Sequence, residues 1–297
     1  MKTDLYQSIT DRIVASLEQG VRPWTKPWSG TEMEGRIVLP KRGNGEAYRG
    51  INILMLWGAA QERGFRAPSW LTYRQAQAMG GQVRKGETGS MVVFASSLTR
   101  TETDSGSGEE QEHRIPFLKS YTVFNVEQID GLGDAFPLST EPALQAFARS
   151  ERAERLFAAT GADIRHGGNR AFYQIADDYV QMPPAEAFRD PASYYAVLAH
   201  EVTHWTRHES RLDRSFGRKR FGDEGYAMEE LVAELGSAFL SAGLDLTPEP
   251  REDHASYIEN WLRVLKGDKR AIFTAASHAQ RAADFLIGRG EEGEAQP

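Results

Sequence analysis

His200, Glu201 and His204 belong to the five-residue motif His-Glu-Val-Thr-His, whose side chains can bind a metal ion and move a proton. On an α-helix, residues four apart lie on the same face, with about 5–6 Å between their Cβ atoms, so both imidazoles can bind one ion. Glu201 lies beside the coordination position that remains open, where its carboxylate can take a proton from a water molecule. The alternative is a helix with two hydrogen-bonded histidines and a surface glutamate. Only seven of the 297 residues are histidine, which argues against a chance match.

The third protein ligand is expected on a later helix, because such sites use three protein ligands and leave one position open. Residues 226–240 predict a helix with an apolar stripe and three glutamates. At 100° per residue, Glu229 lies at the margin of that stripe beside Ala233 and Gly236, small residues that allow another helix to approach. We therefore predict Glu229 as the third ligand. Glu230 is the alternative, since Glu234, one turn later, could then orient a ligand histidine.

Two other side chains and the identity of the ion complete the predicted site. Tyr226 precedes the glutamates, and His208 lies one turn after His204, so either could stabilise a developing oxyanion. For His208, a surface position is the better interpretation. One divalent ion per chain is expected. Zn²⁺ suits two histidines and a carboxylate, and Mn²⁺ is the alternative.

The composition describes a chain suited to a reducing compartment. It contains no cysteine, so disulfides and thiolate chemistry are excluded and a cytoplasmic location is expected. The N-terminus lacks the apolar core of a signal peptide, and no run of about 18 apolar residues occurs, so no membrane partner is expected. Residues 1–98 hold 13 of the 35 basic and 8 of the 42 acidic side chains. The net charge of −7 therefore hides a basic N-terminal third (+5) and an acidic remainder (−12).

The order of the elements predicts an α+β fold with two domains. In residues 1–135, apolar periodicity predicts helices at 5–17, 53–60 and 74–79, and strands at 90–95 and 117–126. Residues 99–114 lie between those strands and contain almost no apolar residue, which predicts a mobile acidic hairpin insertion. The boundary is expected between Gly131 and Pro142. Residues 142–290 then form the domain that carries the metal helix.

Four of the six tryptophans, Trp24, Trp28, Trp57 and Trp70, fall within the first 70 residues, among lysines and arginines. Proteins bind single-stranded DNA with such side chains. Cations neutralise phosphates, and aromatic faces stack on exposed bases, at about 1–3 kcal/mol per base. Core packing is the alternative for each ring. It is the better interpretation for Trp57, which falls inside an apolar helix.

Together these motifs resemble the ArdC-type family of plasmid antirestriction proteins. In the C-terminal half, the resemblance rests on the histidine motif combined with Glu-Glu-Leu-Val-Ala-Glu-Leu-Gly at residues 229–236. In the N-terminal part it rests on Pro-Trp-Thr-Lys-Pro-Trp at 23–28, Tyr-Arg-Gly-Ile-Asn at 48–52, Trp-Leu-Thr-Tyr at 70–73 and Val-Arg-Lys-Gly-Glu at 83–87. These N-terminal motifs are also similar to the N-terminal domain of TraC-type plasmid primases. Nearly the whole chain is covered.

The resemblance implies an N-terminal domain that binds single-stranded DNA and a C-terminal zincin-like metallopeptidase domain. In zincins a substrate peptide commonly lies along an edge strand beside the metal helix, and residues 171–175 are placed to be that strand. By the same resemblance, DNA contacts are expected from eight residues of the first domain: Trp24, Lys26, Trp28, Arg49, Asn52, Trp70, Tyr73 and Lys85.

The implied function is protection of incoming conjugative plasmid DNA from host restriction. The metallopeptidase domain could cleave a protein of the host restriction system. In the alternative, the protein is not an enzyme: it coats single-stranded DNA, and its metal site is structural. The sequence does not decide between these two interpretations.

Overall fold

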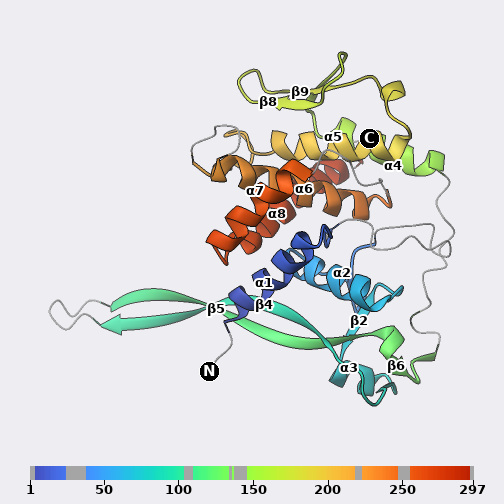
Figure 1. Ribbon diagram of the computed structural model, residues 1–297, viewed down its shortest axis with the longest axis vertical. Coiled ribbons are helices and arrows are strands. Elements are labelled where there is room, and N and C mark those ends of the chain that lie inside the picture. Colours follow the sequence, from blue (N-terminus) through green and yellow to red (C-terminus); the bar gives the residue numbers. More distant parts are fainter. Residues whose placement is uncertain are drawn as a thin grey trace.

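The computed structural model describes residues 4–24, 38–103, 110–133, 136, 146–217, 223–246 and 255–294. Helices and mixed sheets alternate along the chain, which confirms the predicted α+β class. The elements form two lobes, and in the view of Figure 1 α1 and α2 of one lobe lie between its own sheet and the helices of the other. We call residues 4–133 the first lobe and residues 146–294 the second lobe. Among the described residues, no helix has the length and apolar character needed to cross a bilayer.

The first lobe is built around a mixed sheet with the strand order β1-β2-β5-β4. Its elements are α1 (Leu5–Glu18), β1 (Lys41–Arg42), α2 (Ile51–Arg63), β2 (Ser69–Thr72), α3 (Tyr73–Ala78), β3 (Gln82–Val83), β4 (Ser90–Thr103), β5 (Glu110–Asn125), a 3-10 turn η1 (Val126–Gln128) and β6 (Ile129–Asp130). Strand β1 runs parallel to β2, whereas β2–β5 and β5–β4 are antiparallel. A buried stripe on α1, consisting of Ile9, Ile13, Val14 and Leu17, explains why that segment forms an amphipathic helix.

The predicted hairpin between β4 and β5 is confirmed, but its arms are regular strands. The pairing continues from Ser90↔Val123 outwards to Thr103↔Glu110, so the ladder includes most of the polar segment 99–114. Residues 104–109 lie outside the described part of the chain. The hairpin extends well away from the rest of the molecule (Figure 1). Backbone pairing between two adjacent strands therefore orders a segment whose composition cannot form a core.

The described part of the second lobe contains five α-helices and a small sheet. Its elements are α4 (Ala146–Ala159), β7 (Asp163–His166), β8 (Phe172–Gln174), β9 (Tyr179–Met182), a 3-10 turn η3 (Ala185–Ala187), α5 (Pro191–Trp205), α6 (Glu224–Gly243), α7 (Ala255–Gly267) and α8 (Ala271–Glu294). The sheet order is β7-β9-β8, so β8 is an edge strand. Helix α6 contacts α5, α7 and α8, which makes it the central helix of the lobe.

The two lobes share one hydrophobic core. A single cluster of buried side chains includes Ile9 and Leu56 from the first lobe and Leu231 and Leu286 from the second. Helix α1 packs against α7, and α2 against α8. Part of the predicted boundary, between Gly131 and Pro142, lies outside the described residues. A continuous apolar interior therefore joins the two lobes, and the domain bounds 1–135 and 142–290 stay a prediction.

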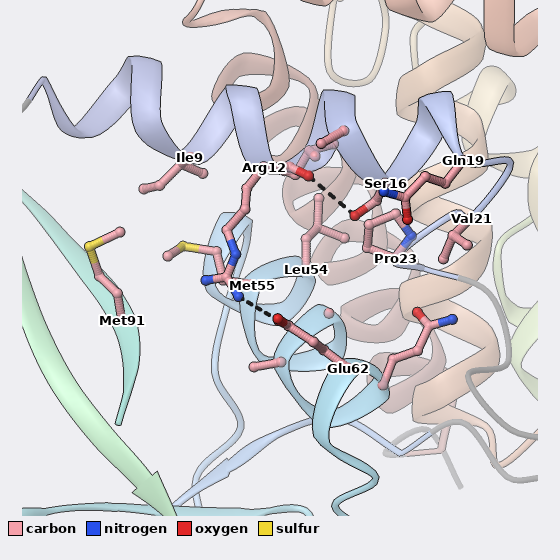
Figure 2. Close-up of a pocket in the computed structure, with 15 residues that line it drawn as sticks. Ile9, Arg12, Ser16, Gln19, Val21, Pro23, Leu54, Met55, Glu62 and Met91 are labelled. Atoms are coloured by element: carbon pink, nitrogen blue, oxygen red, sulfur yellow. Dashed lines mark hydrogen bonds and ion pairs between the residues drawn. The ribbon is translucent and has the colours of Figure 1, made fainter. Parts of the chain in front are cut away.

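An apolar groove separates α1 from α2 on the surface of the first lobe (Figure 2). Its volume is about 380 Å³, and Ile9, Leu54 and Met91 are among its lining residues. At one side, Arg12 Nη2 lies 2.8 Å from Glu62 Oε2, so an exposed ion pair bridges the two helices. Such an exposed pair contributes at most about 1 kcal/mol, and the buried side chains beneath it hold the helices together.

Candidate metal centre

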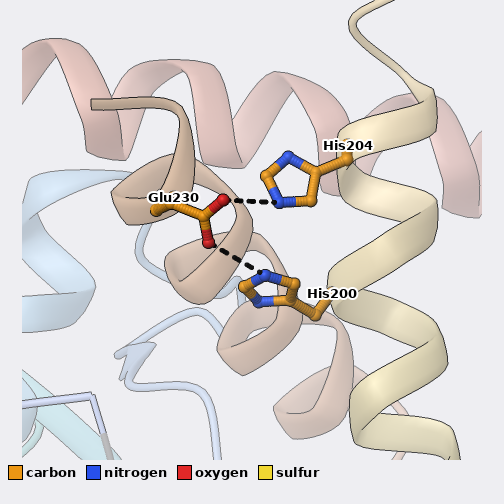
Figure 3. Close-up of side chains that lie close together, drawn as sticks. All are labelled: His200, His204 and Glu230. Carbon is orange, nitrogen blue, oxygen red and sulfur yellow. Dashed lines mark ion pairs between the residues drawn. The ribbon is translucent and has the colours of Figure 1, made fainter. Parts of the chain in front are cut away.

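Helix α5 presents the histidine motif from a well-defined start. The carboxylate of Asp190 accepts a hydrogen bond from the backbone N–H of Ser193 at 2.7 Å, which caps the helix, and Pro191 occupies its first turn. Tyr195, Val197 and Leu198 are buried and point in different directions round the helix, so α5 is covered on several sides. The two histidines lie one turn apart on the face of α5 that meets α6 (Figure 3).

Helix α6 approaches α5 closely because two small residues lie at the contact. A Cβ atom added at Gly236 would lie 2.6 Å from Cγ2 and 2.8 Å from Oγ1 of Thr203. The Thr203 hydroxyl donates to the Ala199 carbonyl at 2.7 Å, so it is held in place. One residue later, the Ser237 hydroxyl donates to the Ala196 carbonyl at 2.8 Å. The prediction that small residues allow a second helix to approach the motif is confirmed at Gly236.

His200, His204 and Glu230 converge on one point (Figure 3). Glu230 Oε2 lies 3.5 Å from His200 Nε2, and Glu230 Oε1 lies 3.6 Å from His204 Nε2. One donor atom from each side chain lies within 4.8 Å of the other two. Ligand bonds to Zn²⁺ are about 2.0–2.2 Å long, so donor atoms around one ion are separated by about 3–4 Å. The three side chains therefore fit a divalent ion with an open fourth position.

The geometry reverses the predicted order of the two glutamates. Glu229 does not face the point between the Nε2 atoms. Its Oε1 lies 3.1 Å from His204 Nδ1, on the far side of that ring. It also accepts from Arg214 Nη2 at 2.8 Å through Oε1 and from Arg214 Nε at 2.9 Å through Oε2. An arginine that bonds both carboxylate oxygens leaves little capacity for an ion, so Glu230 is the better candidate and Glu229 supports the His204 ring.

Glu234 lies on the outer side of His200, where the alternative assignment required it. Its Oε2 is 3.8 Å from His200 Nδ1, and its Oε1 is 3.0 Å from Nη1 of Arg22, a residue of the first lobe. Each histidine thus has a carboxylate near Nδ1 and Glu230 near Nε2. A carboxylate at Nδ1 favours the tautomer that leaves Nε2 available to a metal ion.

The electrostatics of the site favour a bound cation. Burial opposes the charged form of Glu230, but His204 and His200 outweigh it and hold the pKa of its carboxyl far below the usual range. Burial likewise opposes protonation of His204, and the carboxylates of Glu230 and Glu229 outweigh it, raising its pKa to about 10. In the metal-free chain a proton on the imidazole thus supplies the positive charge that the carboxylates require.

A cavity of about 380 Å³ opens onto the three side chains. Glu201, which is 7% exposed, lines it, and so do Tyr226 and Arg207. Burial, followed by the charge of Glu230, raises the pKa of Tyr226, so its phenol stays protonated and can donate a hydrogen bond. Tyr226 is therefore in the predicted place. His208 is not among the lining residues, and its Nδ1 lies 2.8 Å from the Ser210 hydroxyl.

The edge strand β8 forms one wall of this cavity. Phe172 and Tyr173 on β8 line it. The Tyr173 hydroxyl donates to Asp178 at 2.8 Å, and Arg211 Nη1 lies 2.9 Å from the same carboxylate. Arg211 Nε also donates, at 2.7 Å, to the carbonyl of Trp205, which is the last residue of α5. One arginine thus fastens the sheet to the end of the metal helix, which fixes the position of the wall relative to the histidines.

Several residues predicted to contact DNA are not accessible. Trp24 and Trp70 are each 2% exposed, so neither ring face is available to a base, and for them core packing is the correct interpretation. The side-chain amide of Asn52 donates to the Val93 carbonyl at 2.8 Å and accepts from its N–H at 2.7 Å, so it holds α2 to β4. Trp57 is 7% exposed, which confirms that it packs in the core.

The other predicted DNA contacts have different outcomes. Tyr73 is 42% exposed and Lys85 is also exposed. Arg49 is exposed, and its guanidinium pairs with Asp284 of the second lobe. Lys26 and Trp28 lie outside the described residues. Trp24 and Trp70 fail as candidates because a core formed by both lobes covers them.

Three arginines near the site carried no signal in the sequence. Arg214 is 3% exposed and Arg22 is 7% exposed, and each pairs with a glutamate beside a histidine. Arg207 lines the cavity, and its Nε lies 3.9 Å from Glu229 Oε1. Arg207 and Arg214 lie in polar stretches of the chain, and Arg22 lies between Val21 and Pro23. The one indication in the sequence is the group of glutamates on the apolar helix 226–240, because buried carboxylates require cations nearby.

Comparisons with known proteins agree with this architecture. A family model described as the N-terminal domain of anti-restriction factor ArdC matches residues 3–124, and one described as zincin-like metallopeptidase matches residues 151–278. The metal-free crystal structure of antirestriction ArdC protein from the R388 plasmid has 48% sequence identity and a TM-score of 0.81, covering 97% of this chain and 98% of that one. Its Mn(II)-bound structure has a TM-score of 0.79 at the same identity and coverage.

Two further relatives differ in length. Uncharacterized protein y4eC of Sinorhizobium fredii is 46% identical over 289 residues, which cover 96% of this chain and 92% of that protein. DNA primase TraC of Escherichia coli is 37% identical over 301 residues, which cover 97% of this chain but 27% of the primase. The 48% identity with the R388 ArdC protein extends over nearly the full length of both chains. The chain therefore belongs to the ArdC antirestriction family, with an ArdC N-terminal domain followed by a zincin-like metallopeptidase domain.

Proposed function

We propose that this protein is an antirestriction protein whose second lobe binds one divalent metal ion through His200, His204 and Glu230. The convergence of these three side chains carries the proposal. A bound ion would polarise a peptide carbonyl and lower the pKa of water in the open position. Two histidines and a carboxylate suit Zn²⁺, and the R388 relative has been crystallised with Mn(II), so Mn²⁺ is the alternative.

Glu201 supplies the proton transfer in this proposal. Its carboxylate lines the cavity beside the histidines, where it can take a proton from the attacking water and return it to the leaving amine. Tyr226 donates a hydrogen bond to the oxygen on which negative charge develops. The edge strand β8 offers unpaired backbone groups to an extended peptide, so the substrate we propose is a protein segment, for example of the host restriction system.

Metal titration of four full-length proteins tests the ligand set. The wild type should bind about one ion per chain. His204→Ala and Glu230→Gln should lose this ion, because each removes a ligand. Glu229→Gln should still bind it, with affinity lowered by roughly 10–100-fold, since it removes only the support of His204. Retention of the ion by Glu230→Gln and its loss from Glu229→Gln would restore the original order of the two glutamates.

We also propose that the first lobe binds single-stranded DNA without sequence preference, acting on plasmid DNA that enters the cytoplasm of a recipient cell. Membership of the ArdC family supports this. The contacts proposed from the sequence that remain are Lys26, Trp28, Arg49, Tyr73 and Lys85. The exposed aromatics of the sheet are further candidates. Phe94 is 57% exposed and lies opposite Lys119, while Tyr121 is 49% exposed and points to the same face.

Anisotropy of a labelled oligothymidine tests this interface. Each stacked base is worth about 1–3 kcal/mol, so Phe94→Ala and Tyr121→Ala should each weaken binding by roughly 5–150-fold. Ile175→Ala is the matched control, because Ile175 is 43% exposed but belongs to the second lobe. Undiminished affinity in the Phe94→Ala, Tyr121→Ala double variant would move the interface elsewhere on the lobe.

The remaining question is whether protection requires hydrolysis. If it does, Glu201→Gln should bind metal and DNA normally but fail to protect plasmid DNA during transfer into a restricting host. If the protein only coats DNA and its metal is structural, the same variant should protect fully. The cavity beside Glu201 favours the first outcome, because a structural metal site is closed by a fourth protein ligand.

A further inference from the structure

Residues 19–24, which follow α1, pack against the second lobe beside the proposed metal centre. We infer that Arg22, from the first lobe, is a positioning residue of this centre: it holds the carboxylate of Glu234 against His200. The inference rests on the proposed function, in that His200 is taken as a metal ligand. It adds that the metal centre is not complete within the zincin-like lobe.

The contact itself is a buried ion pair between the lobes. Arg22 Nη1 lies 3.0 Å from Glu234 Oε1, and only 8% of the Arg22 side chain and 11% of the Glu234 side chain is exposed. The other oxygen, Oε2, lies 3.8 Å from His200 Nδ1. A single carboxylate therefore faces both groups, and the orientation that satisfies the guanidinium also places an oxygen beside the imidazole.

A second contact anchors the same segment. Trp24, two residues after Arg22, packs edge to face on Trp261 of α7, with ring centroids 5.8 Å apart. Trp24 is 2% and Trp261 is 1% exposed. Trp261 and Glu234 both line the cavity that contains the metal ligands. The tryptophan pair fixes the backbone from which Arg22 extends, so the guanidinium cannot follow Glu234 if that carboxylate rotates away.

Removal of the guanidinium should therefore weaken metal binding without touching a ligand. A buried carboxylate that loses its cation must rotate, recruit water or take up a proton. Each of these changes the charge or the position of the carboxylate that lies 3.8 Å from His200 Nδ1. Loss of such outer partners typically lowers metal affinity by about 10–100-fold.

A double variant distinguishes this indirect role from an independent one. If Arg22 acts through Glu234, then once Glu234 is replaced, the identity of residue 22 no longer matters to the ion. The affinity of Arg22→Gln, Glu234→Gln for metal should then equal that of Glu234→Gln alone. Independent effects would multiply instead. A merely structural role for Arg22 predicts that multiplication.

The experiment is a Mn(II) titration of metal-depleted full-length chains, with free Mn(II) followed by its electron paramagnetic resonance signal. Arg22→Gln should bind Mn(II) about 10–100-fold more weakly than the wild type. Arg22→Lys, which keeps the charge and the fold but not the geometry, should fall between the two. Lys266→Gln is the matched control, because Lys266 also joins the lobes, through Glu18 of α1 at 2.6 Å, but half of each side chain is exposed.

The outcomes separate the inference from the proposed function. Wild-type affinity in both Arg22 variants overturns the inference and leaves the metal centre intact. Equal weakening by Lys266→Gln also overturns it, since the effect would then come from packing between the lobes in general. A wild-type chain that binds neither Mn(II) nor Zn(II), or a His204→Ala chain that binds Mn(II) normally, removes the proposed metal centre and the inference with it.

Discussion

The buried pair of Arg214 and Glu229 should be among the most costly contacts to break. Arg214 is 3% and Glu229 is 2% exposed, and two hydrogen bonds of 2.8 and 2.9 Å join them. Arg214→Met leaves the Glu229 carboxylate with His204 Nδ1 at 3.1 Å and with Arg207 Nε at 3.9 Å, a distance too long for a hydrogen bond. The Thr206 hydroxyl that Arg214 contacts still donates to the Thr203 carbonyl at 2.6 Å, so only the carboxylate is stranded. Removing one partner of a buried pair costs about 3–5 kcal/mol.

The pKa of Glu229 gives the same magnitude independently. Burial raises it, but Arg214 and His204 outweigh burial and lower it from 4.5 to about 2. That difference corresponds to about 3 kcal/mol of stability. Because the folded-state pKa lies below the unfolded one, this contribution is fully present above pH 4.5. It is lost as the pH falls towards 2.

Urea unfolding of chelator-treated protein measures both effects, since a bound metal would otherwise add its own stabilisation. Arg214→Met should lower the free energy of unfolding at pH 7 by about 3–5 kcal/mol. The double variant Arg214→Met, Glu229→Met should lose much less, because it strands no charge. Between pH 5 and pH 2 the free energy of unfolding of the wild type should fall by about 3 kcal/mol more than that of this double variant, which lacks the Glu229 carboxylate.

Two results would refute this reasoning. The first is a cost below about 1 kcal/mol for Arg214→Met, which is typical of an exposed pair. The second is a double variant as unstable as the single one, because the cost would then come from lost packing and not from an uncompensated charge.

Two further predictions concern the helix contact and the ion. Gly236→Ala should cost about 1–3 kcal/mol in urea unfolding and weaken metal binding, because the added Cβ meets Thr203 and separates α6 from α5. Gly243→Ala on the same helix is its control: a Cβ there meets nothing within 4 Å, so this change should be neutral or stabilising, and an equal loss would contradict the contact argument. The apparent metal affinity should rise about tenfold per pH unit from pH 6.5 to 8.5, because His204, with a pKa of about 10, must release a proton to the bulk before it binds. Calorimetry in buffers of different ionisation enthalpy would detect that proton, and a pH-independent affinity would contradict its release.

The type of the longer elements with a clear apolar period could be predicted from the sequence because it follows from local patterns, whereas short strands such as β1 and β3 were not predicted. Helical spacing gave α1 and α2, and four-residue spacing placed His200 and His204 on one face. The choice between Glu229 and Glu230 failed for a physical reason. A helical wheel separates a buried face from an exposed one, but α6 is covered by three other helices, and Glu229 and Glu230 are 2% and 9% exposed. On such a helix the face that bears the glutamates is buried as well, so the helical wheel cannot show which glutamate lies at the edge of the buried surface.

The tryptophans show the same limit at longer range. Trp24 stands among prolines and basic residues, a composition typical of a surface that meets nucleic acid. It is buried because Trp261, more than 200 residues later in the chain, packs against it. The residues that neighbour Trp24 in the sequence do not indicate that Trp261 will cover it. A core shared between lobes is therefore the feature least accessible from composition, and it affected the DNA contacts more than the metal ligands.

The charges of the buried acids explain which carboxylate is left for the ion. Three glutamates of α6 lie near the two imidazoles, and two of them are paired with an arginine: Glu229 with Arg214 and Glu234 with Arg22. Both paired carboxylates lie near the Nδ1 atom of a histidine. There they favour a proton on Nδ1, which leaves the Nε2 atom of the same ring free to bind the ion. Glu230 faces the two Nε2 atoms and the Tyr226 phenol. Within the described part of the chain no arginine forms an ion pair with Glu230, so a divalent cation is the partner that would balance its charge when both histidines are neutral. The proposal of Glu230 as third ligand thus follows from where Arg22 and Arg214 lie, and both come from outside α5 and α6.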